Sequence, residues 1–150
     1  MSRVVPLLCQ ILVSCVVAKD GGTKKVVDVS EDWAVDAPTS VEVQRTTPAE
    51  DFDIVKFSSE GQSILTMYVG NAPHFPTEKC KGNRKATTAG ALEATEVVCA
   101  DPNVGGLSRE VLVDLGVTKG WPRFLHFMQT TKSRPVGDTI VGSLRRKGAR

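Results

Sequence analysis

Two histidines are the first residues in this sequence that could do chemistry. His74 lies between Pro73 and Phe75 in a proline-bounded segment, and His126 lies inside the apolar run 123–129. Loops carry function more often than buried strands, so His74 is the better placed of the two. His126 has no acidic neighbour in sequence, which favours a hydrogen-bonded core or edge histidine over a general base. Neither histidine has a recognisable nucleophile beside it, and no catalytic residue is assigned.

Metal and cofactor chemistry have little support in the sequence. A metal site could in principle use Cys80, Cys99, His74 and His126, but no CxxC or HxxxH spacing is present. The glycine-containing turn at 101–106 lacks the pattern of a phosphate-binding loop. We therefore expect no metal and no cofactor.

Cysteine usage gives a sharper prediction. Of the four cysteines, Cys9 and Cys15 lie near the amino terminus, which leaves Cys80 and Cys99 in the body of the chain. An even pair in an oxidising compartment is most simply a disulfide. Closing a loop of about 20 residues would stabilise the fold by about 3 kcal/mol in the chain-entropy model.

The amino terminus resembles an export signal. Residues 1–14 carry one positive charge, Arg3, followed by an apolar run that is short of the roughly 20 residues a membrane span needs. Residues 12–15, LVSC, resemble a bacterial lipobox, which would make Cys15 the lipidated first residue. Cleavage after Ala18 by ordinary signal peptidase is an alternative, and an unprocessed buried strand is another.

These features predict the organisation and location of the protein. Residues 1–14 would be removed, 15–25 would form a polar tether, and 26–150 would fold as a single α+β domain in the periplasm, anchored to a membrane by lipid. The alternative is a soluble periplasmic or secreted protein. Composition is that of a globular protein, and 19 basic against 17 acidic residues give no electrostatic reason to expect nucleic acid as a partner.

The fold is predicted to centre on residues 50–76, where strands at 51–57 and 64–69 flank a turn containing Gly61. In the second strand, alternation places Leu65, Met67 and Val69 on one face. Residues 46–48 would be a linker and 116–120 a turn. Other strand candidates are 25–29, 33–38, 41–44, a segment ending at 96–99, 109–115 and 123–129, and Trp33 would be a core residue.

The tail at 136–146 has apolar residues at helical spacing, with Asp138 expected in the first turn and basic residues expected in the last turn. Together these segments predict an α+β fold: a mostly antiparallel sheet of five to seven strands with a carboxy-terminal helix packed on one face.

Candidate binding residues gather after the central hairpin. Residues 79–85 carry four positive charges, which could meet an acidic partner or anionic lipid headgroups, although a solvated turn is the alternative. The candidate binding residues are Tyr68, Asn71, His74, Lys79, Lys81, Arg84 and Lys85.

Three segments, YVGNAPHFP at 68–76, WPRFLHF at 121–127 and DTIVGSLR at 138–145, resemble small exported bacterial proteins of unknown function. The resemblance implies no activity. Export, small size and the lack of a catalytic constellation favour a non-enzymatic protein that binds a protein partner in the cell envelope, as an immunity protein, an inhibitor or an accessory subunit. The alternative is a small periplasmic ligand-binding protein or hydrolase that uses His74 and His126.

Overall fold

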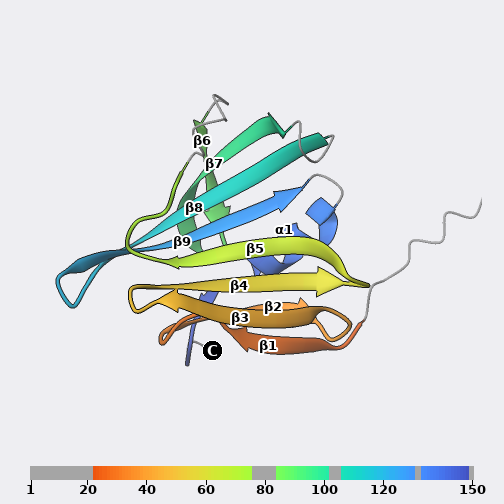
Figure 1. Cartoon of the computed structure of the whole chain (residues 1–150), viewed down its shortest axis with the longest axis horizontal. Coiled ribbons are helices and arrows are strands. Elements are labelled where there is room, and N and C mark those ends of the chain that lie inside the picture. The colour runs from red at the N-terminus through yellow and green to blue at the C-terminus, as the bar shows by residue number, and fades with distance from the viewer. Residues whose placement is uncertain (1–21, 76–83, 102–105, 131–132, 149–150) are drawn as a thin grey trace, which may run out of the picture.

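The structure is a computed structural model that describes residues 22–75, 84–101, 106–130 and 133–148 (Figure 1). The predicted signal peptide, the lipidation site Cys15 and the alternative cleavage site at Ala18 lie outside the described residues. So do Lys79, Cys80 and Lys81.

The described chain contains ten strands and one α-helix. In order they are β1 (Lys24–Asp28), β2 (Trp33–Pro38), β3 (Glu42–Ala49), β4 (Phe52–Ser59), β5 (Gln62–Gly70), β6 (Arg84–Ala89), β7 (Leu92–Asp101), β8 (Gly106–Thr118), β9 (Trp121–Thr130), α1 (Arg134–Gly142) and β10 (Arg145–Arg146). The predicted class, mostly antiparallel α+β with a carboxy-terminal helix, is confirmed.

The strands form two sheets. The larger has seven strands in the order β3-β4-β5-β9-β8-β7-β6, and the smaller has three in the order β1-β2-β10. Helix α1 contacts β5, β9 and β6 of the large sheet and β2 of the small one. Figure 1 shows α1 behind the middle of the large sheet, with the small sheet behind its β3–β4 end. One hydrophobic core therefore joins both sheets and the helix, and it includes Val35, Phe57, Met67, Phe127 and Ile140.

The predicted central hairpin is confirmed as β4 and β5. Its two-residue turn has positive φ at both Glu60 (50°) and Gly61 (74°), which suits the twist of a tight hairpin. Leu65, Met67 and Val69 are at most 1% exposed, as the alternation predicted. This hairpin places β5 in the sheet, where β9 pairs with its other edge.

Several predicted boundaries were wrong. Residues 46–48 are not a linker but part of β3. Because β3 is an edge strand with a neighbour on one side only, a proline is tolerated there although it has no amide hydrogen to donate. Strand β6 was not predicted, because its sequence, RKATTA, lacks large apolar residues. A turn was expected at 116–120, but only Lys119 and Gly120 separate the paired residues Thr118 and Trp121. The expected tether, 15–25, overlaps β1, which begins at Lys24.

The predicted helix 136–146 was also displaced. Helix α1 ends at Gly142, and the next residue, Ser143, bonds to β2: its Oγ accepts the amide hydrogen of Asp36 at 2.7 Å. Arg145 and Arg146 then pair with β2 instead of forming a last helical turn. Asp138 lies beyond the first turn. The tertiary contacts of the tail with β2 therefore outweigh its helical spacing.

Candidate functional site

The residues predicted around the central hairpin divide between two places. Tyr68 stacks on Phe52 with ring centroids 5.3 Å apart, and its hydroxyl accepts the amide hydrogen of Ala72 at 3.1 Å. Asn71, just after β5, lines a cleft at the end of the sheet. His74 is exposed in the segment that follows. Tyr68 therefore has a structural role in fixing this segment, Asn71 is half-buried at the cleft, and His74 is exposed.

His126 lies in a buried polar pair. Its Nε2 is 2.8 Å from Oε2 of Glu110, and the two residues are 2% and 4% exposed. Phe75 packs edge-on against the imidazole at 5.3 Å, and the Arg84 guanidinium lies 5.7 Å from the Phe75 ring centroid. The prediction of a hydrogen-bonded core histidine is confirmed. A site that needs both histidines at the surface is not formed, because His126 is covered and His74 is not.

The two described members of the basic segment, Arg84 and Lys85, are adjacent in β6 and so point to opposite faces of the sheet. Arg84 lies over Phe75, whereas Lys85 forms an ion pair with Glu96 at 2.9 Å. The described part of this segment is therefore not a single basic surface.

Glu96 belongs to a charged cluster beside α1. The Arg109 guanidinium donates to Glu96 and to Oδ1 of Asp138, which also accepts a hydrogen bond from Gln129 at 2.7 Å. Burial raises the pKa of Glu96, but hydrogen bonds and charge from Lys85 and Arg109 outweigh this and hold the pKa below its ordinary value. The cluster fastens α1 to β7, β8 and β9, which is a structural role.

Cys99 is disulfide-bonded. The other three cysteines of the chain, Cys9, Cys15 and Cys80, lie outside the described residues, so pairing with Cys80 stays a prediction. The Sγ of Cys99 also lies 3.2 Å from Oγ of Ser108 on the neighbouring strand β8.

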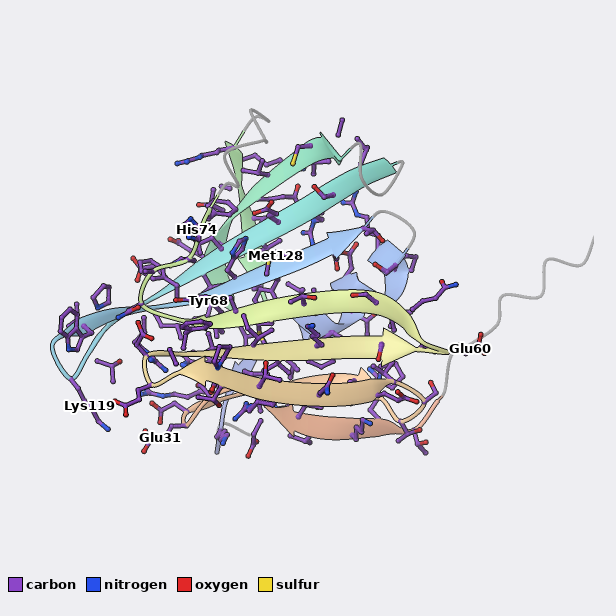
Figure 2. All side chains as sticks on the ribbon, viewed as in Figure 1. Glu31, Glu60, Tyr68, His74, Lys119 and Met128 are labelled. Carbon is purple, nitrogen blue, oxygen red and sulfur yellow. The ribbon has the colours of Figure 1, made fainter. Side chains whose placement is uncertain are left out.

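The best candidate for a binding site is a cleft of about 770 Å³ at one end of the molecule, here called the tryptophan cleft. It lies between the turns β1–β2 and β3–β4 on one side and the β8–β9 hairpin on the other. Figure 2 shows Glu31 and Lys119, from the two sides, at this same end. The lining residues are Ser30, Glu31, Asp32, Trp33, Glu50, Asp51, Val69, Asn71, Leu115, Thr118, Lys119, Trp121, Arg123 and Arg146.

The β8–β9 hairpin extends beyond the rest of the large sheet (Figure 1). Its turn has positive φ at Lys119 (53°) and Gly120 (83°), and Pro122 pairs with Val117 directly behind Trp121. Trp121 is 66% exposed and Val117 is 71% exposed. A tight turn and a proline therefore hold a large apolar side chain in solvent, and such exposed aromatic side chains are typical of binding surfaces.

Seven charged side chains line the cleft, four acidic and three basic. Across the described ranges, none of the seven forms an ion pair. The charged groups of these seven side chains are therefore donors and acceptors in the cleft that form no ion pair with the described residues.

A second hollow, of about 900 Å³, runs along β6, β7 and β8. Small side chains form much of its lining, among them Ala86, Thr87, Thr88, Ala94 and Thr95. It contains no tryptophan and offers fewer large recognition groups than the tryptophan cleft.

Of the residues that line the tryptophan cleft, only Asn71 was among the binding residues predicted from the sequence. Trp33 was expected to be a core residue; it is half-buried and packs against the core, but it also lines the cleft. A signal was present in Lys119-Gly120-Trp121-Pro122, because a tryptophan directly after a tight turn has little room to be buried.

Comparisons with known proteins assign no family. No protein-family model and no curated protein matches the chain. One solved structure, of a protein from Bacteroides thetaiotaomicron VPI-5482, is similar with a TM-score of 0.42 and 8% sequence identity. The match covers 77% of this chain, which spans less than half, 45%, of that protein.

In the described part of the chain, no helix has the length and apolarity required to span a membrane. No group of three or more histidine, cysteine, aspartate or glutamate side chains is arranged to hold a metal ion in the ranges that the structure describes.

Proposed function

We propose that this chain is an exported, lipid-anchored protein of the cell envelope that acts by binding a partner in the tryptophan cleft. The observation that carries the binding part of the proposal is Trp121, held 66% exposed on a protruding hairpin at the rim of the cleft. Tryptophan is enriched among the residues that dominate binding energy. The export part rests on residues 1–14 and on Cys15.

The position of the cleft suits a tethered protein. Strand β1 begins at the end of the molecule where the β4–β5 turn lies, since Lys25 bonds to Val41 and Glu42 pairs with Ser58. In Figure 2, Glu60 marks this end, and Lys119 and Glu31 mark the opposite end. A domain tethered through the residues before β1 would present its cleft away from the attachment point.

The hydrolase alternative, based on His74 and His126, draws less support from this geometry. His126 is 2% exposed beneath Phe75 and bonded to Glu110, so it is not accessible to a substrate in this structure.

The export claim is tested by the intact mass of the protein from a membrane fraction. We expect a lipidated chain beginning at Cys15, two hydrogens lighter than its reduced form, and we expect Cys15→Ser to lose the lipid and leave the membrane. An unprocessed chain with free thiols would overturn this part of the proposal.

The binding claim is tested by cross-linking and capture of the full-length protein in its own membranes. We expect Trp121→Ala to lose the captured partner and Val117→Ala, at the same hairpin but outside the cleft lining, to keep it. Equal capture by both variants would show that the cleft is not the binding site.

A further inference from the structure

The chemistry of the tryptophan cleft selects one class of ligand, and this step rests on the proposed function. We infer that the group bound in the cleft is an uncharged saccharide chain, either part of an envelope polysaccharide or carried as a glycan on a protein partner. Three properties of the cleft carry the inference: two aromatic platforms, unused hydrogen-bonding groups of both kinds, and nearly balanced charge.

The aromatic platforms come from different elements. Trp33 begins β2 and packs against the core, and Trp121 begins β9 directly after the tight turn, where it pairs with Thr118. A sugar ring has one face composed mainly of C–H groups, and stacking this face on an indole removes apolar area from water on both partners. Two tryptophans that reach one cleft from different elements can therefore both stack on sugar units.

The hydrogen-bonding groups match hydroxyls. Carboxylates such as Asp51 only accept, whereas Arg123 and Lys119 only donate. A sugar hydroxyl both donates and accepts, so one neutral ligand can serve both sets. None of these side chains is engaged in an ion pair within the part of the chain that the structure describes.

The charge of the cleft gives no preference for a charged polymer. With three basic and four acidic side chains, the lining has a formal charge of −1. For a polyanion or a polycation, attraction to one set of these side chains is offset by repulsion from the other, so neither gains a strong net attraction over a neutral chain. The volume of about 770 Å³ is within the range of sites for small organic ligands.

The chain contains only two tryptophans, and both line the cleft, so tryptophan emission, excited selectively over the single tyrosine, reports on this site. The purified mature protein would be titrated with cellohexaose, maltohexaose and chitohexaose, with a heparin hexasaccharide as the anionic comparison. We expect a saturable change in tryptophan emission with at least one neutral oligosaccharide and a weaker response to heparin. Trp121→Ala should weaken binding by at least about tenfold, and Val117→Ala by less than about twofold.

The outcomes separate this inference from the proposed function. No emission change with any neutral oligosaccharide, while Trp121→Ala still loses the captured partner, would overturn the saccharide and leave the binding function standing. Neutral binding that is unchanged in Trp121→Ala would also overturn the inference. Capture that is abolished by glycosidase treatment of the partner would identify a protein-borne glycan, whereas competition by envelope polysaccharide alone would identify the free chain.

Discussion

Nε2 of His126 and Oε2 of Glu110 are 2.8 Å apart, on neighbouring strands β9 and β8, in a site where both side chains are at most 5% exposed. The register pairs His126 with Leu112, which places Glu110 diagonally across the ladder, within reach of the imidazole. Water is largely excluded from both groups. Removing either one would therefore leave the other buried without this hydrogen-bond partner, which costs free energy of folding.

Replacing Glu110 by methionine should therefore lower the free energy of unfolding by about 3 kcal/mol, since it leaves the imidazole of His126 without its carboxylate. Urea denaturation measures the effect. Glu93→Met, at an exposed position of β7, is the matched control and should change stability by less than about 0.5 kcal/mol. If Glu110→Met were as stable as this control, the pair would contribute nothing to the fold.

Acid should weaken the cluster around Glu96. Because the pKa of Glu96 is lowered from 4.5 in the folded protein, the unfolded chain takes up a proton at higher pH than the folded chain does. The contribution of Glu96 to stability is complete above pH 4.5 and is lost as the pH falls through the lower folded pKa. Unfolding curves from pH 3 to 7 should show a smaller acid loss in Glu96→Gln than in the natural chain, and parallel losses would contradict this.

The two cations beside Glu96 should differ in importance. The side chain of Arg109 is 8% exposed and bridges Glu96 to Asp138, whereas that of Lys85 is 68% exposed. Arg109→Met should cost about 3 kcal/mol, because it leaves a buried carboxylate with less compensation. Lys85→Met should cost less than about 1 kcal/mol. Thermal or urea unfolding of both variants would test the order, and a reversed order would refute it.

Gly90, in the β6–β7 turn, has φ of 57°, and a Cβ there would overlap the carbonyl oxygen of Leu144. Gly61 has φ of 74° but open space around it. Gly61→Ala should therefore cost only the backbone strain, about 1–2 kcal/mol, and Gly90→Ala clearly more, because the contact with residue 144 must also open. Equal losses of stability in the two variants would show that this close approach is unimportant.

The parts of the fold that sequence predicts best are those governed by local rules. The β4–β5 hairpin follows from alternation and from Gly61, and the inward faces at Leu65 and Met67 follow from the same alternation. Strand β6 lacks this signal, since it is an edge strand of small and charged residues. Strand β10 depends on pairing with β2, more than a hundred positions away in the chain, which no local pattern reveals.

The candidate site was less predictable for the same reason. Trp33, Asp51 and Trp121 come from three separate hairpins, and only the packing of the two sheets brings them to one cleft. Glu110 likewise reaches His126 through strand register, although each residue by itself looked like part of an ordinary strand. The lipobox and the resemblance to exported proteins each rest on short stretches of sequence, and export and lipidation stay predictions.

The small sheet joins the two ends of the described chain, and this has a consequence for biogenesis. Its strands β1 and β2 are synthesised before the other described strands, but the other edge of β2 is filled by β10, and Asp36 is bonded to Ser143. A nascent chain cannot complete this sheet until nearly all of the polypeptide has been made, because the pairing closes a loop of more than a hundred residues. If the chain is exported, as we propose, late completion of this sheet suits translocation, since passage through a narrow channel requires a chain that has not yet folded.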